Sequence, residues 1–206
     1  MDTKTILEIL SKMSKKMEEE KDFLTELDNA IADGDHGINM SKGFLAVNLK
    51  LDEFQGQSIG QVLKTVGMTL VSAIGGSAGP LYGTAFMKAG MVMADKTTMD
   101  INDFLACMKS AVDGVMMRGR SVQGEKTMLD AMIPSLEAME KANSEGLPAK
   151  EVVGAGVTAA KSGVEYTKTI IATKGRASYI GERSIGHQDP GATSFTYLLE
   201  VIAGTL

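Results

Sequence analysis

Apolar residues recur about every three or four positions along most of this 206-residue chain, and this spacing limits its fold more than any other feature. Such spacing places apolar side chains on one face of an α-helix, whereas strands need strict alternation. The pattern indicates helices at residues 6–17, 23–31, 59–74, 104–115 and 129–139, after Pro148, and from Gly191 to the end. No strand-like alternation of comparable length competes with it. The sequence therefore predicts an all-α fold, a single domain over residues 1–206 with about eight bundled helices.

Composition supports this interpretation and restricts the kind of partner. Fifteen methionines and 5% aromatic residues suit helix packing, because methionine fills irregular gaps. The single cysteine, Cys107, lies among apolar residues, and we expect a buried thiol. A net charge of −5 argues against a nucleic-acid binder. Since no segment reaches the roughly 18 apolar residues of a membrane span and the start is amphipathic, we expect a cytoplasmic protein without nucleic-acid or membrane partners.

The most polar stretch, NAIADGDHGINMSKG at residues 29–43, contains Asp33, Asp35 and His36, and Asp28 lies just upstream. Carboxylate oxygens are the ligands that hard cations prefer, and three of them leave positions open for phosphate oxygens, as in many magnesium sites. Without a cation, three carboxylates so close together would repel one another. The pattern therefore predicts a magnesium site.

A calcium loop and a simple turn are the alternatives to a magnesium site in this acidic stretch. A calcium-binding EF-hand that begins at Asp33 would need glycine at position 38 and glutamate at position 44, where the chain has Ile38 and Phe44. An EF-hand is therefore excluded. The aspartates could instead only cap and turn the chain, as in many Asp-Gly turns, and this alternative stays open.

Glycine clusters indicate turns between the predicted helices. They lie at residues 33–43, 75–83, 114–124 and 175–191. Around Ser77, the IGGSAGPLYG segment can bring backbone N–H groups close to an anion, although its glycines could also serve a close helix crossing. The GRSVQGEKT segment is not a P-loop, because Glu125 stands where the lysine must be. Lys126 could reach a nucleotide or simply belong to a helix start.

The late segment GRASYIGERSIGHQDPGATS combines arginines with a helix-start signal. Arg176 and Arg183 are candidate phosphate ligands, since a guanidinium can bind phosphate oxygens in a bidentate manner. Asp189 and Pro190 have the pattern of an N-cap followed by a first-turn proline, which explains them without any ligand. A role of His187 beyond its own turn stays open.

Taken together, four motifs resemble the nucleotide-binding L subunit of bacterial dihydroxyacetone kinase of the phosphotransferase-system-dependent type. They are LDNAIADGDHGINM, GGSAGPLYGTAF, GEKTMLDAMIP and GRASYIGERSIGHQDPGATS. The resemblance implies a barrel-like bundle of antiparallel helices that holds tightly bound ADP or ATP and two Mg²⁺ ions at one end. It further implies a dihydroxyacetone-binding K subunit, an M subunit of the phosphotransferase system that carries a phosphohistidine, and a transcription regulator as partners.

The resemblance also implies roles for individual residues. Asp28, Asp33 and Asp35 would hold the magnesium ions, and Arg176 would be the catalytic residue that faces the transferring phosphoryl group. The nucleotide would be bound by His36, Gly37, Ile38, Asn39, Ser77, Ala78, Gly119, Met128, Arg176, Asp189 and Pro190.

The implied family has two branches. Because no substrate domain follows Leu206, we expect the branch whose ADP stays bound and is recharged to ATP, with the γ-phosphoryl passed to dihydroxyacetone to give dihydroxyacetone phosphate. The alternatives are an ATP-exchanging component of an ATP-dependent kinase, a non-catalytic Mg-nucleotide regulatory module and a metal-dependent phosphohydrolase. The acceptor could also be a related small ketose.

Overall fold

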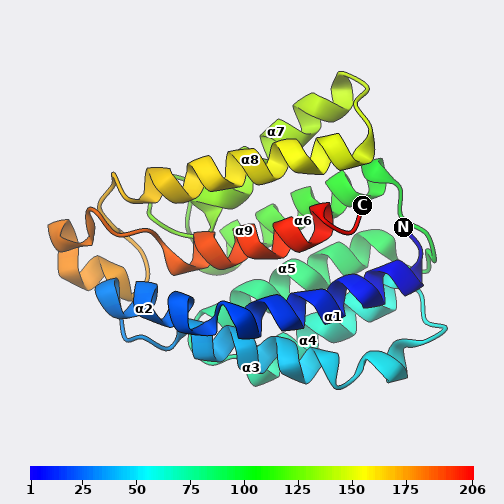
Figure 1. The fold of residues 1–206 in the computed structure, drawn as a ribbon, viewed down its shortest axis with the longest axis horizontal. Coiled ribbons are helices and arrows are strands. Elements are labelled where there is room, and N and C mark those ends of the chain that lie inside the picture. The colour runs from blue at the N-terminus through cyan, green and yellow to red at the C-terminus, as the bar shows by residue number, and fades with distance from the viewer. The chain divides into compact units, whose positions relative to one another are not determined.

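The computed structural model describes residues 1–206, which form helices joined by short connections (Figure 1). The elements are α1 (Thr3–Glu19), α2 (Lys21–Ile31), α3 (His36–Asn48), the 3-10 helix η1 (Leu51–Phe54), α4 (Ile59–Ala73), α5 (Ala78–Met93), α6 (Ile101–Gly119), α7 (Leu129–Ser144), α8 (Ala149–Thr167), the 3-10 helix η2 (Arg176–Ser184) and α9 (Pro190–Ala203). The only extended pairing is an isolated bridge between Asp2 and Thr98. No helix combines the length and the apolar character that a membrane span requires. The all-α prediction is confirmed.

The chain divides into two compact units. Unit 1 contains Met1–Glu18 and Asn39–Arg120, and unit 2 contains Glu19–Ile38 and Ser121–Leu206. The boundary passes through α3, whose first three residues belong to unit 2. The expectation of one domain over residues 1–206 stays a prediction.

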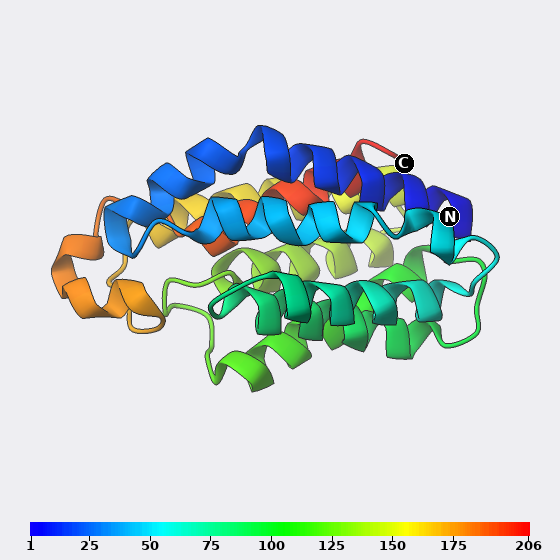
Figure 2. The same cartoon turned by 90° about the horizontal axis from the view of Figure 1, so that it is seen from below.

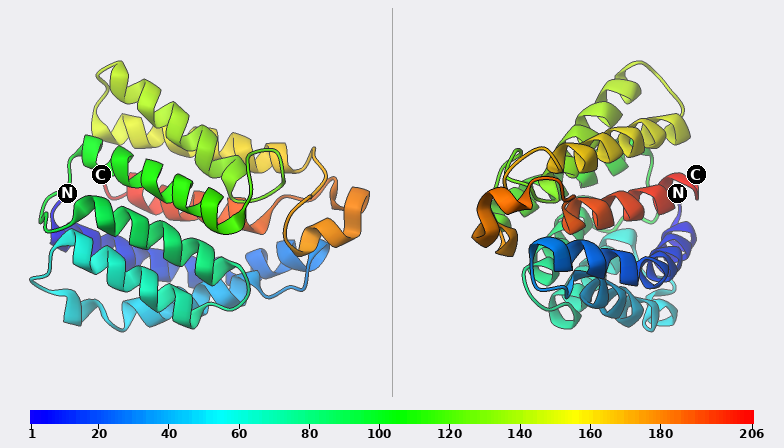
Figure 3. Two further views of the ribbon diagram at one scale, coloured as in Figure 1. Left: turned by 180° about the vertical axis from the view of Figure 1, so that it is seen from behind. Right: turned by 60° about the vertical axis from the view of Figure 1, so that its left-hand side comes forward.

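In unit 1, α4 packs against α5 and α5 against α6, and Figure 3 shows the three helices side by side. A Cβ atom built at Gly67 of α4 would lie 2.6 Å from the carbonyl oxygen of Gly83 on α5. These glycines therefore allow the two helix backbones to approach closely. The rings of Phe44 and Phe86 meet edge to face, with their centroids 6.2 Å apart. Cys107 is buried, as expected, and its thiol donates to the carbonyl oxygen of Ala89.

In unit 2, α8 packs against α7 and α9, while α2 packs against α9 and η2. Figure 2 shows η2, in orange, beside the end of α2. The side chains of Ile31, Ala172 and Ala177 form a small buried cluster, and Ile180 packs against it. This apolar contact holds the start of η2, and with it Arg176, next to the end of α2.

The glycine clusters are only partly turns, and this part of the prediction was wrong. In the cluster at 33–43, α3 already begins at His36, and a Cβ atom at Gly37 would overlap the carbonyl oxygen of Lys21 on α2. At Gly43, a Cβ atom would overlap the side chain of Ile74. These glycines serve helix packing, because only glycine lets a neighbouring chain come so close.

The other three clusters differ from the prediction in the same way. In the cluster at 75–83, α5 begins at Ala78, so the turn itself is short. In the cluster at 114–124, α6 continues to Gly119, and its C-cap residue Arg120 has a left-handed backbone. The cluster at 175–191 contains η2 and the start of α9.

Two details of the helices differ from what the spacing alone indicates. Phe23, the first residue of the predicted range 23–31, is 41% exposed, and Leu24 is buried instead. Pro148 is the N-cap residue of α8.

Candidate functional site

Three carboxylates converge where α2 ends and α3 begins. Asp28 is buried in the last turn of α2, and Asp33 and Asp35 lie in the short turn that follows. One carboxylate oxygen of each lies within 4.8 Å of those of the other two. Gly34, with φ of +73°, supplies the left-handed backbone that reverses the chain there. The structure therefore forms the acidic cluster that the sequence motif indicated.

Asp28 is the fixed point of this cluster. Its Oδ2 atom accepts hydrogen bonds from the backbone N–H groups of Asp35, at 2.9 Å, and His36, at 3.2 Å, and so orders the start of α3. Burial raises the pKa of Asp28, the two N–H donors oppose this shift, and the charges of Asp33 and Asp35 add to it. Three convergent oxygen donors with unbalanced negative charge fit a hard divalent cation such as Mg²⁺.

A cationic side chain reaches the same cluster from η2. The Nη1 atom of Arg176 lies 2.8 Å from Oδ2 of Asp33, and 62% of the Arg176 side chain is exposed. Arg183 lies on the same 3-10 helix and is also exposed. Of the two candidate arginines, Arg176 is the one that the structure pairs with the acidic cluster.

His36 connects the start of α3 to α9. Its Nε2 atom lies 2.9 Å from the hydroxyl oxygen of the buried Ser194. Burial lowers the pKa of His36 to about 4, so the imidazole is neutral at pH 7. His36 therefore offers a hydrogen-bonding ring without a positive charge beside the three aspartates.

The N-terminus of α9 contains two further predicted residues. Asp189 is its N-cap and accepts a hydrogen bond from the N–H of Ala192 at 2.7 Å, and Pro190 follows in the first turn. A Cβ atom at Gly191 would lie 3.5 Å from that of Met128, so Met128 packs beside this helix start. The helix-start interpretation of Asp189 and Pro190 is confirmed, and the structure brings Met128 next to them.

Asp189 is also an unusual carboxyl group. Burial raises its pKa to about 7. Its hydrogen bond from Ala192 and the charge of Lys126 oppose this shift, while Asp130 and Asp28 add to it. Its Oδ2 atom accepts the capping bond, and its backbone N–H and carbonyl group already bond to Thr167 and Thr193.

The remaining predicted residues are divided between the two units. Gly37 and Ile38 continue α3 within unit 2, and 55% of the Ile38 surface is exposed. The others belong to unit 1 and are Asn39, Ser77, Ala78 and Gly119. A Cβ atom at Gly75 would lie 3.4 Å from the amide oxygen of Asn39, so Asn39 lies beside the turn that precedes α5.

The turn before α5 is followed directly by two more of the predicted residues, Ser77 and Ala78. Ser77 is the N-cap residue of α5 but makes no capping hydrogen bond with its side chain, and Ala78 is the first helical residue. Gly119 is the last residue of α6. Unit 1 therefore gathers Asn39 and Ser77–Ala78 around one turn, and Gly119 lies at a separate helix end.

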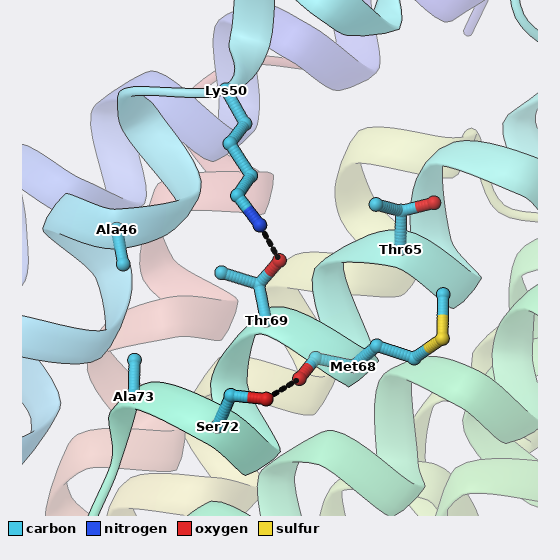
Figure 4. Close-up of a pocket in the computed structure, with 7 residues that line it drawn as sticks. All are labelled: Ala46, Lys50, Thr65, Met68, Thr69, Ser72 and Ala73. Carbon is cyan, nitrogen blue, oxygen red and sulfur yellow. Dashed lines mark hydrogen bonds between the residues drawn. The ribbon is translucent and has the colours of Figure 1, made fainter.

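Unit 1 also has a hollow of about 360 Å³ (Figure 4). It is lined by Ala46, Lys50, Thr65, Met68, Thr69, Ser72 and Ala73. The Lys50 ammonium points into it and donates to the hydroxyl of Thr69 at 3.2 Å. None of the predicted site residues lines this hollow.

Sequence reasoning missed two buried charged residues. Asp130 is fully buried in the first turn of α7, and nothing in its local pattern distinguishes it from an ordinary helix-start aspartate. Lys126 was expected to reach a nucleotide or to belong to a helix start. It lies in the turn before α7, as the second alternative has it, and is 1% exposed, and its ammonium donates to the carbonyl oxygens of Thr167, Ile170 and His187.

The chain belongs to the DAK2 domain family, whose sequence profile matches residues 30–204. Within this family it is 41% identical over 184 residues to the PEP-dependent dihydroxyacetone kinase, ADP-binding subunit DhaL, of Escherichia coli (strain K12), a match that covers 89% of this chain and 88% of that protein. It is 37% identical over 198 residues to the PTS-dependent dihydroxyacetone kinase, ADP-binding subunit DhaL, of Lactococcus lactis, with 96% of this chain and 95% of that protein covered. The resemblance seen in the sequence motifs is thereby confirmed.

The fold has a solved counterpart. The crystal structure of the dihydroxyacetone kinase of C. freundii in its native form matches all of this chain with a TM-score of 0.77 and 19% identity. This chain covers 35% of that longer chain. At this identity the match establishes the fold.

Proposed function

We propose that this protein is the ADP-binding subunit of a phosphotransferase-system-dependent dihydroxyacetone kinase. Relatives named as ADP-binding subunits of a PEP-dependent and a PTS-dependent dihydroxyacetone kinase match it over 88% and 95% of their own length. The observation that carries the chemistry is the convergence of Asp28, Asp33 and Asp35 within 4.8 Å, with Arg176 against one of them. The subunit would hold a nucleotide and pass its γ-phosphoryl group to dihydroxyacetone.

In this proposal the three aspartates bind metal and Arg176 binds the phosphoryl group. Asp28, Asp33 and Asp35 would hold two magnesium ions, which when bound offset the charge of the phosphate oxygens. Arg176 is exposed, so its side chain can turn from Asp33 to the transferring phosphoryl group and stabilise its charge. No side chain of this subunit needs to form a covalent bond with the phosphoryl group.

The nucleotide itself would be bound by residues at helix starts and, for Gly119, at a helix end. In unit 2 they are His36, Gly37, Ile38, Met128, Asp189 and Pro190, and in unit 1 they are Asn39, Ser77, Ala78 and Gly119. Backbone N–H groups at the starts of α3, α5 and α9 suit phosphate oxygens, because a helix N-terminus carries partial positive charge. The neutral ring of His36 suits hydrogen bonding rather than charge pairing.

The partners follow from the same proposal. A K subunit would bind dihydroxyacetone, a phosphohistidine on an M subunit of the phosphotransferase system would recharge the bound ADP, and a transcription regulator would respond to the complex. The related kinases named L-erythrulose 1-kinase and triokinase/FMN cyclase match this chain at 32% identity over 31% and 32% of their lengths. A small ketose related to dihydroxyacetone therefore stays as an alternative acceptor.

The first test identifies the nucleotide that stays bound to the protein through purification. The full chain is purified without added nucleotide, passed through gel filtration in magnesium buffer and denatured, and any released nucleotide is identified. About one equivalent of ADP is expected for a tightly held coenzyme. An empty site that fills reversibly with ATP would instead identify an ATP-exchanging kinase component.

A second test measures phosphoryl transfer directly. The chain is combined with phosphoenolpyruvate, the phosphotransferase components, a K subunit and dihydroxyacetone, and dihydroxyacetone phosphate is measured. Product that depends on this chain supports the proposal. Steady phosphate release from ATP by this chain alone would show a phosphohydrolase, and nucleotide binding without any transfer would show a regulatory module.

A further inference from the structure

Lys126 is a fully buried lysine whose hydrogen bonds are all made to the backbone. Its ammonium group donates to the carbonyl oxygens of Thr167, Ile170 and His187. A lysine ammonium has three N–H donors, and three carbonyl oxygens satisfy them. Burying a charge without such partners would strongly destabilise the fold.

The three carbonyl groups come from two segments, one at the end of α8 and one just before α9. Thr167 ends α8 and Ile170 follows it, whereas His187 lies two residues before the N-cap of α9. The N–H of Asp189 donates to the Thr167 hydroxyl at 2.9 Å, and the N–H of Gly186 donates to the carbonyl of Lys168 at 2.8 Å. Lys126 and Thr167 together therefore fix the backbone on both sides of residue 188.

The loop that carries Lys126 is itself ordered by hydrogen bonds. Lys126 has a left-handed backbone, with φ of +60°, which is uncommon for a residue with a long side chain. The Asp130 carboxylate accepts hydrogen bonds from the N–H groups of Gly124, at 2.5 Å, and Thr127, at 2.8 Å. Met128 follows directly and packs beside the start of α9.

The charges nearby favour a charged ammonium at this position. Burial lowers the pKa of Lys126, while the carboxylates of Asp189 and Asp130 act in the opposite direction. Asp189 belongs to the start of α9 and Asp130 to the first turn of α7. The two carboxyl groups that oppose the effect of burial on Lys126 thus belong to two different helix starts.

We propose that Lys126 is a positioning residue for the nucleotide, because its ammonium fixes Asp189 through the carbonyl of His187 and its strained loop fixes Met128. The inference rests on the proposed function, in which Asp189 and Met128 contact the nucleotide. Lys126 itself has no donor left for a phosphate. Its contribution to binding is the placement of these two residues.

The test is the substitution Lys126→Met in the full chain, with ADP and Mn²⁺ as separate probes. Methionine keeps an unbranched side chain of similar length but removes the ammonium donor from the carbonyl groups of Thr167, Ile170 and His187. The acidic cluster is built by the α2–α3 turn, which Lys126 does not contact in any of its hydrogen bonds. We therefore expect ADP affinity to fall at least about tenfold, while the affinity for Mn²⁺ alone changes less than about twofold.

Lys50→Met is the matched control, because this lysine donates to a single hydroxyl in the hollow on unit 1. It should leave both affinities unchanged. Thr167→Val is the second variant, since it removes the hydroxyl that holds the N–H of Asp189 while leaving Lys126 in place. It should weaken ADP binding in the same direction, and it keeps the test decisive if Lys126→Met fails to fold.

Three results would overturn the inference. Unchanged ADP affinity in a folded Lys126→Met variant shows that the lysine does not position the nucleotide. Equal losses of ADP and Mn²⁺ affinity show that it only supports the fold. If Lys126→Met does not fold and Thr167→Val binds ADP normally, the inference also fails. A wild-type chain that binds no ADP at all overturns the proposed function itself and is recognised before any variant is made.

Discussion

The Nη1 atom of Arg176 lies 2.8 Å from the Oδ2 atom of Asp33, so a 3-10 helix late in the chain brings a guanidinium to an acidic turn near its start. The apolar cluster of Ile31, Ala172 and Ala177, whose members lie close in sequence to Asp33 and Arg176, holds the two segments together. The pair itself is exposed, and exposed ion pairs add little to stability. Its value therefore lies in where it places the arginine.

Arg176→Ala should separate catalysis from binding. We expect phosphoryl transfer to fall about 10²- to 10³-fold, the usual effect of removing a donor that stabilises transition-state charge. The free energy of unfolding should change by less than about 1 kcal/mol, because the ion pair is exposed. Product formation in the reconstituted system and urea unfolding measure the two effects. Arg183→Ala, on the same 3-10 helix, is the control, and equal rates for both variants would remove Arg176 from the catalytic role.

Asp28→Asn should abolish the response to magnesium without harming the metal-free fold. The asparagine carbonyl can still accept from the N–H groups of Asp35 and His36, and a neutral group at this buried position removes the repulsion from Asp33. We therefore expect an equal or higher Tm without metal and little gain when Mg²⁺ is added, since only a bound ligand stabilises the folded state. Thermal unfolding with EDTA and with Mg²⁺ measures both. Asp22→Asn, on the exposed part of α2, should keep the wild-type response; an undiminished gain in Asp28→Asn would argue against the site.

The pKa of Asp189 predicts a distinct dependence of stability on pH. Burial raises it from 3.8 to about 7, so between these values the folded state keeps a proton that the unfolded state releases. The contribution of this group to the free energy of unfolding is therefore full below about pH 4 and is lost as the pH rises to about 7. Asp189→Asn keeps an N-cap residue but cannot titrate.

Urea unfolding of the wild type and of Asp189→Asn, in EDTA and between about pH 4 and 7, measures the difference in their free energies of unfolding. We expect the wild type to lose stability relative to Asp189→Asn as the pH rises from about 4 to 7, with a constant difference above that. Other titrating groups cancel in the comparison. Parallel curves would mean that the carboxyl group of Asp189 titrates normally.

Two glycines of α8 offer an internal comparison of helix packing. A Cβ atom at Gly163 would overlap the carbonyl oxygen of Asp130 on α7, whereas one at Gly154 would meet no atom within 4 Å. Gly163→Ala should therefore lower the free energy of unfolding by about 1–3 kcal/mol, as overpacking does. Gly154→Ala should raise it by up to about 1 kcal/mol, because alanine favours the helix. Chemical denaturation measures both, and a neutral Gly163→Ala would show that α7 and α8 can separate at no cost.

The helices with a continuous apolar face were predictable from the sequence, and the packing glycines were not. The spacing of Ile59, Val62 and Val66 places them on one face of α4, and all three are fully buried. Gly37 and Gly43 look like turn residues in the sequence, but they lie in α3 where another segment approaches closely. A glycine permits either role, and the choice depends on a distant neighbour that local sequence does not reveal.

The candidate site was predictable as motifs but not as contacts. The acidic turn could be recognised because three carboxylates within eight residues are unusual in a local pattern. The pairing of Arg176 with Asp33 and of His36 with Ser194 joins segments far apart in the chain. The role of Lys126 was missed for the same reason, since its carbonyl partners lie 41 to 61 residues further along.

The left-handed backbone at Lys126 also limits which amino acids this position accepts. Glycine adopts a φ of +60° without strain, but it has no ammonium for the carbonyls of Thr167, Ile170 and His187. Lysine donates to the carbonyl groups but adopts this backbone conformation only with strain. Neither glycine nor lysine therefore meets both the backbone and the hydrogen-bonding requirement. Saturation mutagenesis at this codon should therefore retain lysine almost alone, and the side chain rather than the backbone decides the outcome.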